Sequence, residues 1–355
     1  HEGFGLLCCA RQFKMIFRLC PRSLMCYCIA PNTMVTSLSA KMNYCTKDLR
    51  GKTLINVQDA IAVSREKNVK FIDGSWWLGK ERDGRQDFET GPRISNARFL
   101  DIDSISTKTP DNLPHMIPSS HQQSIFMDAM DISETDHVIV YGGKDCMFIS
   151  RAYWQIKSFH PRGLCHLLDG SLQDWIDANG PVEEKDQIPI YPVIELMDKK
   201  ETTYNAINLQ NLVDIDELKS LIEDGKTTDE ESTVLLIDAR SPARFSGEVA
   251  EPRKDLKQGH MPGAKNLFFL DLLDPENKNK FKPKDELRRI IQGAGIKLPL
   301  RPDSKIISSC GSGVTACCLL TAFDILDEDS SNTYLYDGSW VQWGSQEDTP
   351  IIKDE

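Results

Sequence analysis

One short segment near the C-terminal end of the chain combines a cysteine with residue types that bind anions. Residues 306–320 read Ile-Ile-Ser-Ser-Cys-Gly-Ser-Gly-Val-Thr-Ala-Cys-Cys-Leu-Leu. A β-type run ends at Ser309, a helix-compatible run begins near Ala316, and residues 310–315 form the loop between them. Gly311 and Gly313 allow the backbone between them to turn its N–H groups inward. The helix that follows adds its positive N-terminal end. A cysteine in this place favours the thiolate, and the segment predicts a sulfur nucleophile or a persulfide carrier.

Two other interpretations of Cys310 fit this segment less well. Buried cysteines are often inert, and Cys317 and Cys318, in their apolar helical run, fit that description. Glycines on both sides of Ser312 are not needed for core packing, which favours a reactive Cys310. A tyrosine-phosphatase-type loop has Cys, five residues and then Arg, but Ala316 stands at the Arg position. Cleavage of phosphate monoesters is therefore disfavoured.

The elements that must hold Cys310 occur twice along the chain. In each copy, two β-type runs are followed by a helical pattern and then by an Asp-Gly-Ser motif. Strands that alternate with helices indicate βα units and a mainly parallel sheet. The matching pairs are residues 71–73 and 236–238, 137–141 and 305–309, 150–159 and 316–326, and the motifs that begin at Asp169 and Asp337.

The two copies differ at the position of the cysteine. Asp337 lies 27 residues after Cys310, and the residue 27 positions before Asp169 is Gly142. The first copy is therefore predicted to be catalytically silent. Its own cysteine, Cys146, comes four residues later, and we expect it to be redox-neutral or peripheral.

The repeat predicts an α/β protein with two tandem domains, each a mainly parallel sheet flanked by helices. The length of 355 residues fits two domains. We place a non-catalytic domain at residues 48–180 and a catalytic domain at residues 211–355. The intervening residues 181–210 contain three prolines and little helical periodicity, which indicates a linker.

Residues 1–47 differ from the rest of the chain. They hold six Lys or Arg and a single acidic residue, Glu2, together with six of the eleven cysteines. A basic, acid-poor composition is typical of a mitochondrial presequence, and a disordered tail or translated non-coding sequence is the alternative. We exclude this N-terminal extension from the predicted domains.

The overall composition narrows the classes of partner. The formal net charge of -11 argues against a general nucleic-acid surface, which needs a basic excess. The sequence contains no run of about 18 apolar residues, so it predicts no membrane span. No pair of Cys-x-x-Cys motifs with zinc-ribbon spacing occurs, so no metal site is predicted.

These motifs resemble those of the tandem rhodanese-domain sulfurtransferases, and among them the 3-mercaptopyruvate sulfurtransferases. The resemblance covers about residues 50–345. Residues 310–317 resemble the mercaptopyruvate-type active loop, with uncharged residues where thiosulfate-preferring relatives typically carry basic side chains. Further matches lie at residues 238–245, 251–253 and 259–264 in the second copy and at 101–103 and 115–118 in the first.

The resemblance implies roles for residues of the second copy. Cys310 would accept the sulfur atom. Arg244 and Arg253 would hold the carboxylate and carbonyl of the substrate, for which the planar guanidinium is suited. The backbone of the loop would bind the donor and stabilise negative charge on sulfur, through Gly311, Gly313, Val314 and Thr315.

The resemblance also implies a contribution from the first copy. Ser312, His115 and Asp103 correspond to a proposed Ser-His-Asp relay near the sulfur. The stretch from Asp103 to His115 is one residue longer than in the usual pattern. The first domain would form one wall of a single active cleft.

The activity implied is transfer of sulfur from 3-mercaptopyruvate, a small anionic donor, to a thiol or cyanide acceptor, with release of pyruvate. Two-step chemistry through a Cys310 persulfide predicts ping-pong kinetics and needs no metal or organic cofactor. Thioredoxin or a persulfide-accepting thiolation protein would serve as thiol acceptor. No direct nucleic-acid or membrane partner is expected, and the compartment would be mitochondrial or cytoplasmic.

Three alternatives remain open. Thiosulfate is one alternative donor. Another is a persulfide relay protein, as in fungal relatives that serve tRNA wobble-uridine thiolation. Both require Cys310. An inactive binding module is the third, and the intact loop at residues 310–315 disfavours it.

Overall fold

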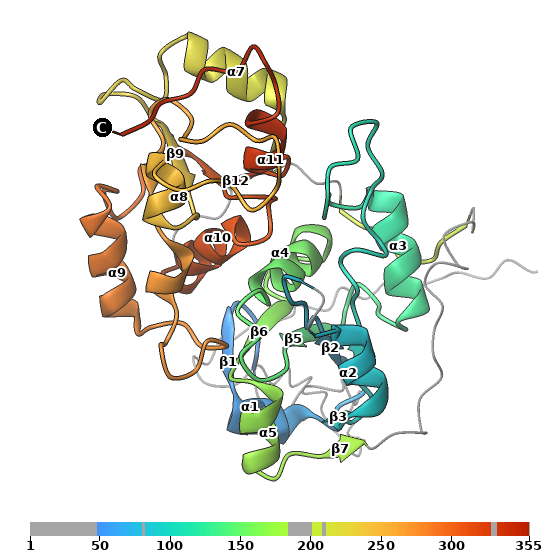
Figure 1. The fold of residues 1–355 in the computed structure, drawn as a ribbon. Helices are drawn as coiled ribbons and strands as arrows, with labels where there is room; N and C mark the ends of the chain where they lie inside the picture. The colour runs from blue at the N-terminus through green and yellow to red at the C-terminus, as the bar shows by residue number, and fades with distance from the viewer. Residues whose placement is uncertain (1–47, 80–81, 184–200, 208–210, 328–331, 355) are drawn as a thin grey trace, which may run out of the picture. The chain divides into compact units, whose positions relative to one another are not determined.

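The computed structural model contains two five-stranded sheets (Figure 1). The structure describes residues 48–79, 82–183, 201–207, 211–327 and 332–354. The possible presequence in residues 1–47 and much of the predicted linker lie outside these ranges. Every strand pair within the two sheets is parallel.

The first sheet has the strand order β1-β6-β5-β2-β4. A short antiparallel pair, β3 with β7, lies outside it. The strands are β1 (Leu54–Asn56), β2 (Val69–Asp73), β3 (Arg93–Ile94), β4 (Arg98–Phe99), β5 (His137–Tyr141), β6 (Cys165–Asp169) and β7 (Val182–Glu183). The helices are α1 (Val57–Val63), α2 (Gly84–Thr90), α3 (Ser120–Ala129), α4 (Ser150–Phe159) and α5 (Leu172–Asp177).

The second sheet repeats this topology, with the corresponding order β8-β12-β11-β9-β10. Its strands are β8 (Leu212–Val213), β9 (Val234–Asp238), β10 (Lys265–Asn266), β11 (Lys305–Ser309) and β12 (Thr333–Tyr336). The helices are α7 (Ile215–Glu223), α8 (Pro242–Ser246), the 3-10 helix η1 (Phe269–Leu272), α9 (Lys284–Gly293), α10 (Ala316–Ile325) and α11 (Ser339–Trp343). The predicted fold class is thus confirmed.

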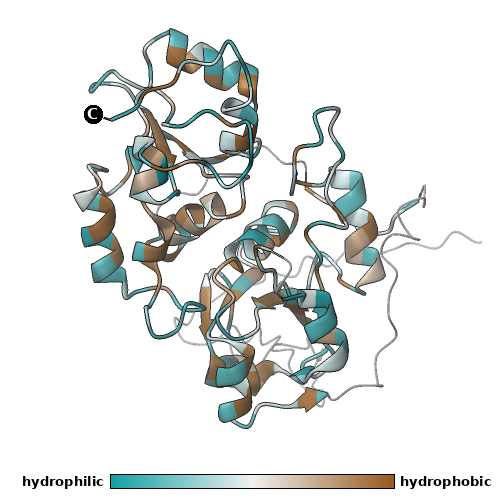
Figure 2. Ribbon diagram, in the orientation of Figure 1, coloured by the Kyte–Doolittle hydropathy of each residue, from teal (hydrophilic) through white to brown (hydrophobic). Residues whose placement is uncertain are grey.

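Hydrophobic strands explain why both sheets are covered by helices. All five residues of β5 and four of the five residues of β11 are buried. Strands that are apolar on both faces must be covered on both faces, which parallel βα units achieve. Figure 2 shows hydrophobic residues along the central strands and alternating hydrophilic and hydrophobic residues on α9.

The parallel arrangement places the carboxyl ends of neighbouring strands at one edge of each sheet. Ser309 of β11 pairs with Asp238 of β9. The segments that follow these strands, including Cys310, therefore begin side by side. In open α/β sheets, ligands bind at this edge.

Helix α4 of the first half packs against α10 of the second half. Lys157 forms an ion pair with the buried Asp324, and Thr53 Oγ1 donates to the Asp324 carbonyl oxygen at 3.2 Å. Ile156 and Leu319 belong to one hydrophobic cluster. The two halves thus share buried contacts along α4. Among the described helices, none has the length and apolar character needed to cross a membrane.

Candidate active site

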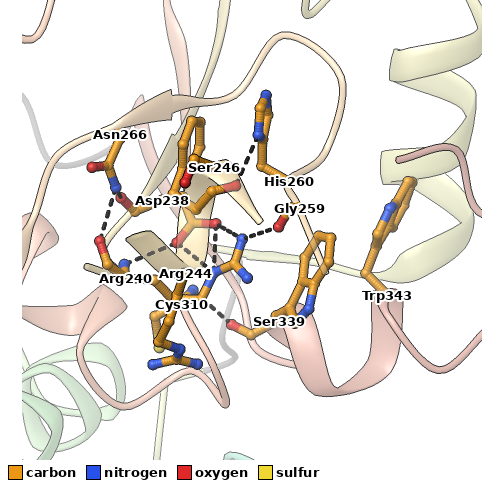
Figure 3. Close-up of polar contacts among 12 residues, drawn as sticks. Asp238, Arg240, Arg244, Ser246, Gly259, His260, Asn266, Cys310, Ser339 and Trp343 are labelled. Atoms are coloured by element: carbon orange, nitrogen blue, oxygen red, sulfur yellow. Dashed lines mark hydrogen bonds and ion pairs between the residues drawn. The ribbon is translucent and has the colours of Figure 1, made fainter. Parts of the chain in front are cut away.

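Cys310 lies in a loop between β11 and α10 that the start of α11 holds in place. The Cys310 backbone N–H donates to Ser339 Oγ at 3.1 Å, a contact that Figure 3 shows. Trp340 N donates to the Cys310 carbonyl oxygen at 3.0 Å, and Val341 N donates to the Gly311 carbonyl oxygen at 2.9 Å. Cys310 is only 2% exposed. The loop is therefore a rigid, nearly covered setting for a thiol.

The other residues predicted in the loop continue from Cys310 into the first turn of α10. Ser312 and Val314 are buried, whereas Gly311 and Thr315 are partly exposed. Cys317 N donates to the Val314 carbonyl oxygen at 3.3 Å. The predicted loop thus leads directly into the N-terminal end of a ten-residue helix, where backbone N–H groups favour negative charge.

The two loop glycines are required by different neighbours. Gly313 has a φ of +78°, and a Cβ there would lie 2.8 Å from two oxygens of Asp337. At Gly311, a Cβ would lie 3.0 Å from Arg244 Nη2. Gly313 thus permits a left-handed turn, and Gly311 permits the approach of a guanidinium.

Four buried or half-buried charges surround the end of β9. Arg240 Nη2 donates to Asp238 Oδ2 at 2.7 Å and to the Gly259 carbonyl oxygen at 2.9 Å, as Figure 3 shows. Glu251 accepts from Arg240 Nη1 at 2.9 Å and from Arg244 Nη2 at 2.5 Å. One carboxylate therefore holds two guanidinium groups, and only Arg244 is partly open to solvent, with 25% of its side chain exposed.

Arg253, the second predicted substrate arginine, is partly exposed and lies in the segment after Glu251. Within the described ranges we find no hydrogen bond or ion pair for its guanidinium. Its five N–H donors are therefore available to an anionic ligand.

The structure brings Asp103 and His115 together despite the additional residue between them. His115 Nδ1 contacts Asp103 Oδ1, and Trp76 Nε1 donates to Asp103 Oδ2 at 2.9 Å. Partial burial opposes ionisation of Asp103, but hydrogen bonds from His115 and Trp76 hold its pKa below the ordinary value. In the part of the chain that the structure describes, Ser312 makes no hydrogen bond with His115. The Asp–His pair is formed, whereas the complete relay is not.

Three residues near the loop were not predicted as site residues from the sequence. Ser339 accepts from the Cys310 backbone, and Asp337 accepts from Ile117 N at 2.7 Å. Arg151, from the first half, donates to Asp337 Oδ1 at 2.8 Å. The repeated Asp-Gly-Ser motif marked Ser339 and Asp337 as notable, but nothing in the sequence pairs them with the loop.

The corresponding place in the first half is filled. Asn279, which comes from the second half, donates from Nδ2 to the Gly143 carbonyl oxygen at 2.9 Å. Cys146 is fully buried, and this burial raises the pKa of its thiol to about 11. These are the surroundings of an inert thiol.

The described residues offer no set of side chains suited to bind a metal ion. They contain no cluster of three or more His, Cys, Asp or Glu side chains arranged to hold an ion. Their five cysteines, Cys146, Cys165, Cys310, Cys317 and Cys318, are unpaired thiols. The candidate site therefore consists of a thiol, backbone N–H groups, arginines and an Asp–His pair.

Comparison with known proteins supports a family assignment. Residues 214–346 match the rhodanese-like domain family. The chain is 34% identical over 273 residues to the 3-mercaptopyruvate sulfurtransferase of Escherichia coli K12, covering 77% of this chain and 87% of the relative. It is 32% identical over 324 residues to the mitochondrial thiosulfate/3-mercaptopyruvate sulfurtransferase 1 of Arabidopsis thaliana, covering 89% and 82%.

A solved structure supports the same assignment. The Tum1 protein from Saccharomyces cerevisiae superimposes with a TM-score of 0.71 at 28% identity, covering 86% of this chain and 98% of that one. The resemblance inferred from the loop at residues 310–317 is thereby confirmed. The chain belongs to the rhodanese-domain sulfurtransferases of the 3-mercaptopyruvate/thiosulfate type, and it is an enzyme that transfers sulfur.

Proposed function

We propose that this enzyme takes sulfur from 3-mercaptopyruvate, carries it as a persulfide on Cys310, passes it to a thiol or cyanide, and releases pyruvate. The observation that carries the proposal is the position of Cys310. It stands in a glycine-containing loop at the N-terminal end of α10, with the Arg244 guanidinium directly over Gly311. Helix N-termini and nearby arginines both favour a thiolate and an anionic donor.

The first half-reaction is a displacement at sulfur. The Cys310 thiolate attacks the sulfur of the donor, the carbon–sulfur bond breaks, and its electron pair forms the enolate of pyruvate. Protonation of the enolate carbon yields pyruvate. In the second half-reaction, an acceptor thiolate or cyanide attacks the outer sulfur and releases the Cys310 thiolate.

The charges near the loop favour a donor with one carboxylate. The carboxylates of Asp238 and Glu251 offset the guanidinium groups of Arg240 and Arg244. The proposal gives Arg253, for which no ion pair is found among the described residues, the role of holding the donor carboxylate. Thiosulfate, a dianion, would be better served by the basic loop side chains that are absent at Gly311, Ser312 and Gly313.

The Asp103–His115 pair would assist proton movement. Asp103 fixes the orientation of the His115 ring, because His115 Nδ1 contacts its carboxylate. The other ring nitrogen, Nε2, is then the group that would exchange protons with the donor. The hydrogen bond to Ser312 that would extend the relay to the sulfur is not formed among the described residues.

Two finer alternatives share this site. Thiosulfate is the second donor, and the names of the Arabidopsis and yeast relatives include it. A persulfide relay to a thiolation protein would use the same Cys310 with a protein acceptor. Of the two expected compartments, mitochondrial and cytoplasmic, the first has support from one relative that is named as mitochondrial.

Steady-state kinetics test the proposed donor and nucleophile together. Pyruvate release from 3-mercaptopyruvate and thiocyanate formation from thiosulfate are measured for the wild type and Cys310→Ser, with cyanide or dithiothreitol as acceptor. We expect a preference for 3-mercaptopyruvate and loss of both activities in Cys310→Ser. A preference for thiosulfate would overturn the donor assignment. An active Cys310→Ser would overturn the mechanism.

A further inference from the structure

Arg151 is a fully buried arginine of the first half whose donors reach both loops of the site in the second half. Its side chain is 1% exposed. Nη1 donates to the Gly313 carbonyl oxygen at 3.1 Å and to Asp337 Oδ1 at 2.8 Å. Nη2 donates to the carbonyl oxygen of His115. One guanidinium therefore contacts the loop of Cys310 and the backbone of His115 at the same time.

Asp337 completes this connection from the opposite side. Its Oδ1 accepts from Arg151, and its Oδ2 accepts from Ile117 N at 2.7 Å. Ile117 is two residues after His115, so the carboxylate holds the same segment that the guanidinium holds. The side chain of Asp337 is 6% exposed, so both charges of the pair are shielded from water.

His115 and Gly313 both adopt a left-handed backbone conformation, which glycine tolerates and histidine disfavours. The φ of His115 is +59° and that of Gly313 is +78°. A left-handed conformation is unfavourable for histidine by roughly 1 kcal/mol and persists where contacts determine it. The carbonyl oxygen of each residue accepts from Arg151. The guanidinium is therefore placed to stabilise the geometry of both loops.

We propose that Arg151 and Asp337 are a positioning pair that fixes the Cys310 loop and the His115 segment relative to each other. This inference rests on the proposed sulfur transfer through Cys310. The role of the first half is then more specific than that of a wall, because it supplies the side chain that aligns the two loops. Because both side chains are buried and their donors and acceptors are occupied by the two loops, we expect their effect on rate to be indirect.

A second ion pair on the same helix provides a matched control. Lys157 lies six residues after Arg151 on α4 and pairs with Asp324, which is 5% exposed and belongs to α10. This pair also joins the two halves, but its described contacts do not include the loop of Cys310 or the segment of His115. Loss of either pair weakens the contact between halves, whereas only loss of the first changes the site.

The test compares Arg151→Met with Lys157→Met in the full chain. Both are measured for unfolding midpoint and for kcat and KM of pyruvate release from 3-mercaptopyruvate. For Arg151→Met we expect kcat to fall about 100-fold, the scale expected for a misplacement of about 1 Å in a reacting group. KM should change less than threefold, since Glu251 still holds Arg244. Lys157→Met should keep kcat within twofold of the wild type.

Asp337→Asn provides a second variant of nearly the same volume, in case Arg151→Met does not fold. It keeps the side-chain shape but removes the charge that Arg151 pairs with, and we expect kcat to fall at least tenfold with an unchanged KM. Equal kcat losses in the Arg151 and Lys157 variants, or an unchanged kcat in Asp337→Asn, would overturn the inference. Activity in Cys310→Ser would instead overturn the proposed function, so the two failures are distinguishable.

Discussion

At the scale of single residues, Glu251 offsets the positive charge of two arginines next to the Cys310 loop. Its carboxylate is 2% exposed and accepts hydrogen bonds from both Arg240 and Arg244. Two arginines at this edge of the sheet would otherwise present an excess of positive charge to the loop. Family resemblance implied a substrate contact for Arg244, whereas nothing in the sequence indicates that a carboxylate shares its guanidinium.

Glu251→Gln should shift the donor preference towards thiosulfate. Loss of one negative charge favours a dianion over a monoanion, and we expect the ratio of kcat/KM for thiosulfate to that for 3-mercaptopyruvate to rise about tenfold. The two activities are measured on the same preparation. Glu248→Gln, an exposed neighbour, is the control and should leave the ratio unchanged. An unaltered ratio in folded Glu251→Gln would contradict this role.

At the scale of elements, the turn from β11 into α10 depends on Gly313. Its positive φ and its closeness to Asp337 leave no room for a side chain. The alternation of strand, glycine-containing loop and helix was readable from the sequence, and both β11 and α4 begin and end at the predicted residues. The requirement for Gly313 was not predictable from the sequence, because Asp337 approaches it only in the folded chain.

Gly313→Ala should destabilise the protein by about 1–3 kcal/mol, the range for a left-handed residue with a side chain in a tight turn. Chemical denaturation measures the change. Gly293→Ala is the matched control, because nothing lies within 4 Å of a Cβ at Gly293, in the last turn of α9. That variant should be neutral or stabilising by up to about 1 kcal/mol. Equal effects of the two substitutions would contradict the structural requirement at Gly313.

At the scale of the whole molecule, the stability of the first half responds to pH through buried histidines. His137 Nδ1 and His166 Nε2 are 2.9 Å apart on the neighbouring strands β5 and β6. Burial lowers the pKa of His166 to about 4, from an ordinary value near 6.5. The unfolded chain therefore binds more protons than the folded chain between these values, and stability falls as the pH falls from 6.5 to 4.

His166→Asn should remove much of this dependence. Relative to the variant, the wild type should lose roughly 3 kcal/mol of its free energy of unfolding as the pH falls from 6.5 to 4. Denaturation curves at several pH values in this window measure it. Asp73, whose pKa burial raises to about 6, titrates in both proteins and cancels in the difference. A difference that stays constant with pH would rule out His166 as the source.

The duplication was visible in the sequence, but the hydrogen bonds between its two copies were not. The 27-residue register predicts Gly142 as the counterpart of Cys310 in a first copy that is expected to be silent. Local patterns cannot show that Arg151 reaches Gly313, 162 residues away, or that Asn279 reaches Gly143, 136 residues away. The pairing of Asp103 with His115 came from family resemblance alone. Long-range polar contacts depend on how the two halves pack, which periodicity does not encode.

The central claim, that Cys310 carries the transferred sulfur, is tested most directly by mass spectrometry of the enzyme after 3-mercaptopyruvate is added without an acceptor. A persulfide on Cys310 predicts one additional sulfur atom on the peptide that contains Cys310, and its loss when cyanide is added. Pyruvate release without this sulfur on Cys310, or a sulfur atom found instead on Cys317 or Cys318, would contradict it.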